Sequence, residues 1–297
     1  MSFRPFNPVI ISILLIGTIL AACQASTPNI IPTLSNPFDK KVDVGGFGLH
    51  IHCAGQGSPT VIIETGFGEP GVEKETSSWI KIADEISKTT RICLYDRAGL
   101  GSSDVAPGEN RTSQDMARDL HTLLVHASVP SPFILVGHSI GVFHVLVFAS
   151  KYADELVGMV LVDASHPDQW SAINAVLPPE SPDEPESIKR IRIIPPASLP
   201  EKMDIPASIN QVKSIKSLGN LPLIVLSHNP TWSINPNLSP VLSEKIEQIW
   251  ENQQNEYANL SSNSTHVIAT KAGHYIQVDE PQLVIDAIRK VIAKARK

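Results

Sequence analysis

A serine stands between two glycines directly after a short apolar run. The run 133–136 is followed by the pentapeptide Gly-His-Ser-Ile-Gly at 137–141, and a helical pattern of apolar residues begins at 142. Glycines allow a sharp backbone turn, and a strand, a tight turn and a helix in that order raise a serine hydroxyl above a sheet edge. The pattern predicts that Ser139 is a nucleophile for a carbonyl carbon; the alternative is a serine in a purely structural turn.

A histidine near the C-terminus is the best candidate for the base that a serine nucleophile needs. His274 lies in Ala-Gly-His-Tyr at 272–275, after the apolar run 265–270 and before a helix that Asp-Glu-Pro at 279–281 would open. Several of the other nine histidines lie inside apparent strands or helices, where packing explains them. We therefore predict that His274 takes the proton from Ser139.

Short runs rich in Val, Ile and Leu alternate with longer amphipathic stretches. The runs are continuous, as in strands that are covered on both faces, and lie at 60–63, 91–95, 133–136, 159–162, 223–226 and 266–269. The amphipathic stretches lie at 79–87, 112–126, 142–152 and 281–297. This alternation predicts an α/β fold with a mainly parallel sheet and helices on both faces. Ligands bind such sheets beyond the carboxyl ends of the strands, which is where Ser139 and His274 would stand.

Composition and charge narrow the function. The chain has 297 residues, of which 42% are hydrophobic and 18% charged, enough for one large core. No linker-like segment follows residue 40, so 40–297 is expected to be one domain. The net charge is −6 and the basic residues are scattered, which excludes the basic stripe of a nucleic-acid-binding protein. Nothing in the sequence implies a cofactor.

The N-terminal segment has the pattern of an export signal. Residues 1–8 contain Arg4 and no acid, and the apolar run 9–20 is shorter than the ~20 residues of a membrane-spanning helix. The run ends in Leu-Ala-Ala-Cys, which resembles the lipobox of bacterial lipoproteins. The resemblance implies a signal peptide over 1–22 and a lipid on Cys23, with a plain secretory signal or an uncleaved anchor as alternatives. The Pro-, Ser- and Thr-rich stretch 23–39 is expected to be a tether.

Three motifs together resemble the α/β-hydrolase superfamily, particularly its bacterial esterase and lipase-like members. They are Gly-His-Ser-Ile-Gly, Tyr-Asp-Arg-Ala-Gly-Leu-Gly-Ser-Ser at 95–103, and Ala-Gly-His-Tyr. The resemblance covers the chain from about residue 42 and implies an eight-stranded, mainly parallel sheet. It also implies a short cap inserted at approximately 165–220, where we expect one helical piece near 209–218. Asp96 and Arg97 are expected to fix their own loop rather than to do chemistry.

The family places its catalytic acid after the sixth or the seventh core strand. After the run 223–226 no carboxylate occurs before Glu244, whereas Asp163 directly follows the run 159–162. We therefore predict Asp163 as the acid that orients His274. Asp168, Glu244 or a dyad without an acid are the alternatives. His166 and Asp168 lack a third ligand at a recognisable spacing, so no metal is predicted.

The resemblance also implies an oxyanion hole and a disulfide. Ile140 would donate one main-chain N–H, and Phe67, in the loop 64–70 where relatives often have His-Gly, would donate the second. Cys53 and Cys93 would lie on adjacent strands of the family's sheet, so a disulfide between them is geometrically reasonable; two buried free thiols are the alternative.

The predicted function is that of a serine hydrolase that cleaves a small ester through an acyl-enzyme. The cap would line the pocket and set substrate choice. An amidase or acyltransferase with the same triad, and a non-catalytic binding lipoprotein on this fold, are the alternatives. We expect an exported protein held on a membrane of the bacterial envelope through Cys23.

Overall fold

One sheet of eight strands runs through the part of the chain that the computed structural model describes, residues 38–72, 78–194, 200–231 and 238–297. The strand order is β1-β2-β4-β3-β5-β6-β7-β8. The strands are β1 (Phe38–Asp43), β2 (Gly48–Ala54), β3 (Thr60–Glu64), β4 (Ile92–Tyr95), β5 (Phe133–His138), β6 (Leu156–Val162), β7 (Leu223–Ser227) and β8 (Ser264–Ile268). β2 pairs antiparallel with β1 and β4, and all other pairs are parallel. The predicted fold class is confirmed.

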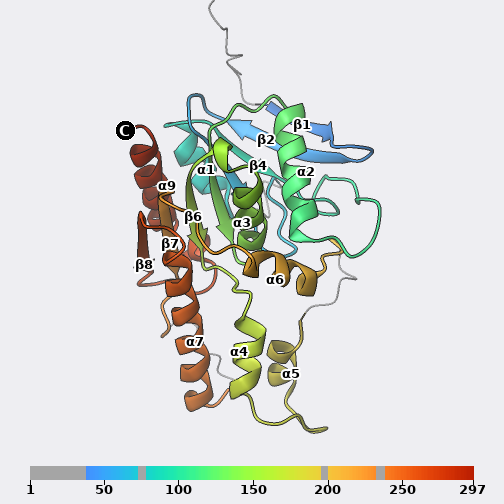
Figure 1. The fold of residues 1–297 in the computed structure, drawn as a ribbon, viewed down its shortest axis with the longest axis vertical. Helices are drawn as coiled ribbons and strands as arrows, with labels where there is room; N and C mark the ends of the chain where they lie inside the picture. The colour runs from blue at the N-terminus through green and yellow to red at the C-terminus, as the bar shows by residue number, and fades with distance from the viewer. Residues whose placement is uncertain (1–37, 73–77, 195–199, 232–237) are drawn as a thin grey trace, which may run out of the picture. The chain divides into compact units, whose positions relative to one another are not determined.

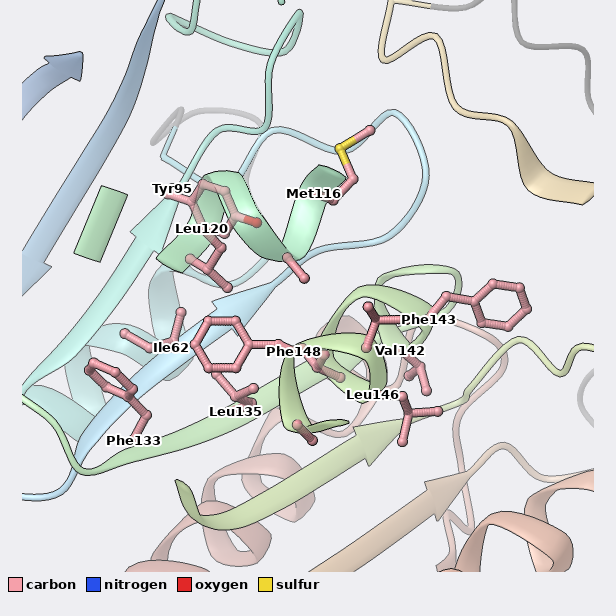
Figure 2. Packing of buried hydrophobic residues seen from close by; sticks show 14 of the residues in the cluster. Ile62, Tyr95, Met116, Leu120, Phe133, Leu135, Val142, Phe143, Leu146 and Phe148 are labelled. Atoms are coloured by element: carbon pink, nitrogen blue, oxygen red, sulfur yellow. The ribbon is translucent and has the colours of Figure 1, made fainter. Parts of the chain in front are cut away.

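Helices cover both faces of this sheet because successive strand residues point to opposite sides. On one face Phe133 and Leu135 of β5 belong to the cluster that includes α2 (Ser113–His126) and α3 (Gly141–Lys151). On the other face Ile134 and Val136 pack with α1 (Ile80–Ser87) and α9 (Pro281–Ala295). Figure 1 shows α2 and α3 on one side of the strands and α9 on the other. In Figure 2, Ile62 and Leu135 of the sheet lie close to Phe148 of α3.

Three helices lie in the described residues between β6 and β7, where the cap was expected. They are α4 (Gln169–Val176), α5 (Glu186–Arg192) and α6 (Ile205–Lys213). The predicted single helical piece at 209–218 was therefore wrong in position and number: α6 begins earlier, where Asp204 caps its first turn by accepting from the Ala207 N–H. α4 packs on the long helix α7 (Pro240–Ala258), which also packs along β7 and β8. Figure 1 shows α4 and α5 side by side, away from the strands.

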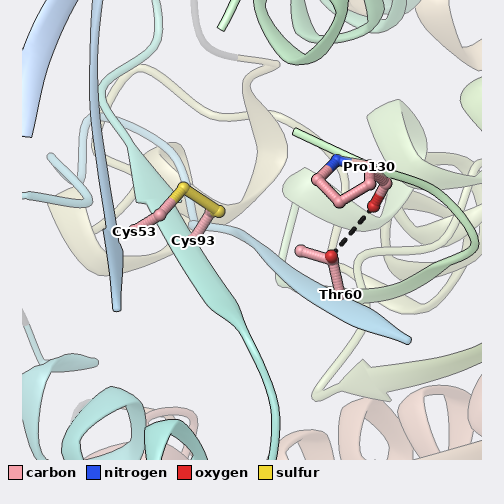
Figure 3. The surroundings of a disulfide bond; sticks show 4 residues. All are labelled: Cys53, Thr60, Cys93 and Pro130. Atoms are coloured by element: carbon pink, nitrogen blue, oxygen red, sulfur yellow. Dashed lines mark hydrogen bonds between the residues drawn. A yellow bond between two sulfur atoms is a disulfide. The ribbon is translucent and has the colours of Figure 1, made fainter. Parts of the chain in front are cut away.

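The two cysteines of the sheet form a disulfide. Cys53 of β2 and Cys93 of β4 stand opposite each other in the antiparallel register, and their sulfur atoms are bonded (Figure 3). Of the two alternatives that the sequence left open, the structure has the disulfide.

The predicted signal peptide, Cys23 and most of the predicted tether lie outside the described residues. β1 begins at Phe38, so the last residues of the stretch 23–39 belong to the sheet rather than to a tether. Among the described helices, none has the length and apolar character needed to cross a membrane.

Candidate active site

Ser139 sits in the turn between β5 and α3 with a left-handed φ of 53°. The glycines on either side are required by close packing. A Cβ on Gly141 would lie 2.4 Å from the Thr65 carbonyl oxygen, and one on Gly137 would lie 2.8 Å from a methyl carbon of Val145. The Ser139 N–H donates to the Val162 carbonyl at 3.1 Å, which ties the turn to the end of β6. The turn has the strand, sharp turn and helix geometry of a nucleophile elbow.

His274 lies within hydrogen-bond reach of this serine. Its Nε2 is 3.0 Å from Ser139 Oγ, although the two residues are 135 positions apart. The loop that carries His274 follows β8 and is held by two hydrogen bonds. The Gly273 N–H donates to Asp279 at 3.0 Å, and the His274 carbonyl oxygen accepts from His138 Nε2 at 3.0 Å. The predicted nucleophile and base are brought together.

Asp163 completes the arrangement from the end of β6. Its Oδ2 lies 2.6 Å from His274 Nδ1, and its side chain is fully buried. Burial alone would raise the pKa of Asp163, but the hydrogen bonds from His228 and His274 hold it well below the usual range of a carboxyl group. The rival carboxylates lie elsewhere: Asp168 pairs with Lys213 at 2.6 Å, and Glu244 is exposed on α7.

The two expected oxyanion donors have unoccupied N–H groups. Within the described residues, the main-chain N–H groups of Ile140 and Phe67 donate no hydrogen bond. The N–H groups around Phe67 are used: Gly66 donates to Glu69 at 3.2 Å and Gly68 donates to Glu201 at 2.6 Å. The loop 64–70 therefore keeps one free donor between two anchored residues, as a preorganised anion site requires.

The comparisons with known proteins concern the fold. Residues 59–193 match the sequence model of a family described as "alpha/beta hydrolase fold". The chain has the α/β-hydrolase fold. Two of the three motifs, at 95–103 and 137–141, lie within the matched residues, and the expected fold is confirmed.

The proteins that this chain resembles include some that are named for an activity and some that are not. It is 28% identical to the uncharacterized protein YqjL of Bacillus subtilis over 85% of this chain and 91% of that protein. An esterase from Thermogutta terrifontis superposes with a TM-score of 0.58 at 23% identity, over 88% of this chain and all of the other. Mouse alpha/beta hydrolase domain-containing protein 10 superposes with a TM-score of 0.63 at 16% identity, over 86% and 99%. These structures show the fold alone.

Arg97 was expected to fix its own loop, 95–103, but its hydrogen bonds go to another loop. It is buried and donates to the Thr65 carbonyl at 2.7 Å and the Gly66 carbonyl at 2.5 Å, so it braces the oxyanion loop rather than its own. It also pairs with Glu64 at 2.8 Å and Glu201 at 2.5 Å. Burial raises the pKa of Glu64, and Arg97 only partly offsets this effect. Arg97 therefore supports the loop 64–70 of the candidate site.

Asp96 supports two loops at once. Its Oδ1 accepts from the N–H groups of Gly71 and Val72, at 2.8 and 2.9 Å, and its Oδ2 accepts from Ser102 at 3.1 Å. Ser102 lies in the same loop as Asp96, as expected, whereas Gly71 and Val72 directly follow the loop 64–70. The side chain of Asp96 is fully buried.

Three residues that the sequence did not reveal surround the acid. His228 directly follows β7 and donates to Asp163 from both its N–H and its Nδ1, each at 2.9 Å. Trp250 of α7 donates from its indole N–H at 3.0 Å. Glu247, one turn earlier on α7, lies 2.7 Å from His228 Nε2. The one available signal was that His228 follows an apolar run at the place where relatives carry their acid.

His166 and Asp168 do not form a metal site. His166 Nε2 faces Glu256 at 3.4 Å, and its Nδ1 accepts from the Asp168 N–H at 3.2 Å. Burial lowers the pKa of His166 to about 4, so the ring is neutral near neutral pH. The described residues contain no cluster of three or more side chains that could hold a metal.

Proposed function

We propose that this α/β-hydrolase cleaves carboxylic esters through an acyl-enzyme. The observation that carries the proposal is the unbroken series of contacts from Ser139 Oγ through His274 to Asp163, at 3.0 and 2.6 Å. Because His274 Nδ1 donates to Asp163, its Nε2 is free to accept the serine proton.

The residues present account for each step of ester hydrolysis. Ser139 Oγ attacks the carbonyl carbon while His274 Nε2 takes its proton, and the N–H groups of Ile140 and Phe67 stabilise the oxyanion. His274 then returns the proton to the leaving alcohol, which leaves an ester on Ser139. A water molecule, deprotonated by His274, releases the acid and restores the serine. Asp163 stays ionised throughout and stabilises the imidazolium.

The nature of the nucleophile and of the solved neighbours favours esters. A serine at the elbow forms an acyl-enzyme with esters, and one neighbour of the same fold is named as an esterase. Another is named as a degrader of N-acyl homoserine lactones, which are cyclic esters. The cap formed by α4 and α5 is proposed to choose the substrate.

A fluorophosphonate probe, which phosphonylates an activated serine, tests the proposal. We expect stoichiometric labelling of the wild-type protein and none of Ser139→Ala. Turnover of p-nitrophenyl esters of rising chain length should fall roughly a thousandfold or more in that variant. Ser150→Ala, which removes a hydroxyl bonded only within α3, is the matched control. Labelling that persists in Ser139→Ala would contradict Ser139 as the nucleophile. A wild-type protein that neither labels nor turns over esters would contradict the proposal and favour a binding protein.

The proposed location is the bacterial envelope, with the protein anchored through a lipid on Cys23. The N-terminal pattern and the disulfide between Cys53 and Cys93 support it, because disulfides persist in exported proteins. The intact mass of the exported protein tests the anchor: a diacylglycerol group must add to a chain that starts at Cys23.

A further inference from the structure

Two histidines share the carboxylate of Asp163. His274 Nδ1 lies 2.6 Å from Oδ2 and serves the triad, whereas His228 Nδ1 lies 2.9 Å from both oxygens. The main-chain N–H of His228 and the indole N–H of Trp250 donate to Oδ1 as well. The carboxylate that orients the base is thus itself held by groups from the end of β7 and from α7.

The second nitrogen of His228 faces another carboxylate. Its Nε2 lies 2.7 Å from Glu247 Oε2, while its Nδ1 donates to Asp163. A neutral imidazole donates from only one ring nitrogen, and an ionised carboxylate only accepts. With both carboxylates ionised, both nitrogens of His228 carry hydrogen. The ring is then a cation between two anions, and with 7% of its side chain exposed it is shielded from solvent.

The surroundings of His228 favour this charge. Burial favours the neutral ring, but the hydrogen bonds with Asp163 and Glu247 outweigh it and raise the pKa of His228 to about 9. The titratable groups that face the ring from the described elements are Asp163 at the end of β6, Glu247 on α7 and, through Asp163, His274 after β8.

We infer that His228, paired with Glu247, is a positioning residue of the triad that fixes the orientation of Asp163 and offsets part of the negative charge facing His274. The inference rests on the proposed hydrolase function. A cation beside Asp163 weakens the hold of that carboxylate on a proton of His274. The net negative charge that faces His274 is therefore smaller than it would be beside an uncompensated carboxylate.

The substitution His228→Gln tests the inference. It removes the cation but keeps one amide N–H for Asp163. We expect the acid limb of the kcat/KM profile to move to higher pH by about one unit. On that limb kcat should fall about tenfold with KM unchanged, because His228 acts through Asp163 and not on the substrate. His266→Gln is the matched control: His266 bonds Ser227 and Asn255 rather than Asp163, and its pH profile should remain that of the wild type.

The charge on His228 has a second readout that needs no substrate. In 15N-histidine NMR spectra of the free protein, the His228 ring should be an imidazolium near neutral pH and should titrate near the pKa of about 9. Glu247→Gln keeps an acceptor for Nε2 and removes the anion, so the same ring should titrate at lower pH. This measurement also serves if His228→Gln does not fold.

The outcomes separate the inference from the function on which it rests. A wild-type protein without labelling or turnover contradicts the hydrolase proposal. An active wild-type protein whose acid limb is unmoved by His228→Gln contradicts the inference alone. A His228 ring that is neutral near neutral pH overturns it whatever the activity.

Discussion

Ser139 and Asp163 share an unusual backbone conformation. Their φ angles are 53° and 44°, in the left-handed region that residues with a Cβ rarely adopt. Each follows a buried parallel strand, and the two turns are hydrogen-bonded: the Ser139 N–H donates to the Val162 carbonyl. A conformation of this kind persists only where its surroundings enforce it, and here both turns bring side chains to one edge of the sheet.

Asp163→Asn is expected to disable catalysis without disturbing substrate binding. An asparagine amide facing His274 Nδ1 would force the proton onto Nε2, which could then no longer accept from Ser139. We expect kcat to fall by roughly three to four orders of magnitude with KM within about twofold. Asp168→Asn is the control, because that carboxylate pairs with Lys213 at 2.6 Å. Near-normal turnover of Asp163→Asn, measured with the same esters, would assign the acid elsewhere.

The sequence revealed those site residues whose position is local. Ser139, Asp163 and His274 each come soon after an apolar run, so a parallel sheet brings them to one edge. Glu247 and Trp250 could not be found in this way. They lie on a helix that meets Asp163 only through tertiary packing, and no pattern in 240–258 marks the face of α7 that turns to the site.

At the scale of elements, the loop 64–70 is held by Glu201, which lies between α5 and α6 of the cap region. Glu201 accepts from the Gly68 N–H at 2.6 Å and from Arg97 Nε at 2.5 Å. Arg97 in turn binds two carbonyl groups of the loop. Gly99 lies so close to the Pro200 carbonyl that a Cβ would not fit there. The segment that contains Pro200 and Glu201 therefore packs tightly on these loops. In the proposed mechanism, the cap region and the loop that would bind the oxyanion are thus joined through Glu201.

Glu201→Gln is expected to loosen the oxyanion loop. The variant keeps one amide oxygen but loses the charge that pairs with Arg97 and leaves a buried donor poorly satisfied, at a cost of about 1–3 kcal/mol in unfolding free energy. We expect kcat to fall roughly tenfold, less than the loss of a whole oxyanion donor, with little change in KM. Glu184→Gln, which breaks an ion pair with Arg192 in the cap, is the matched control. Equal kinetics in the two variants would contradict a role for Glu201 in positioning the loop.

The strands and helices that are most deeply buried were the easiest to predict from the sequence. Strands that are covered on both faces, such as β3 and β5, appear as continuous apolar runs. The helices α4 and α5 have no buried residues, so the sequence has no apolar periodicity there that would predict a helix. α7 buries mostly polar side chains such as Gln253 and Gln254, which hydrophobic periodicity does not detect.

At the scale of the whole molecule, the cysteines connect the fold with its proposed compartment. The disulfide between Cys53 and Cys93 closes a loop with a sequence separation of 40 and joins the antiparallel edge to the parallel centre of the sheet. Such a bond forms and persists in an oxidising compartment. It thus agrees with the export that the N-terminal pattern predicts, while the sequence alone could not decide between a disulfide and two free thiols.

A thiol count on the exported protein tests export, lipidation and disulfide together. The chain has three cysteines. If Cys23 carries a thioether-linked lipid and Cys53 is bonded to Cys93, alkylation of the denatured, unreduced protein should add no group. Reduction should then expose two thiols, and Cys23→Ser should lose the lipid mass while keeping both of these results. Reduction frees the two cysteines of a disulfide but not a thioether, so the lipid stays on Cys23 in this step. One adduct before reduction would mean that Cys23 is unmodified. Two adducts before reduction would mean that Cys53 and Cys93 are not bonded.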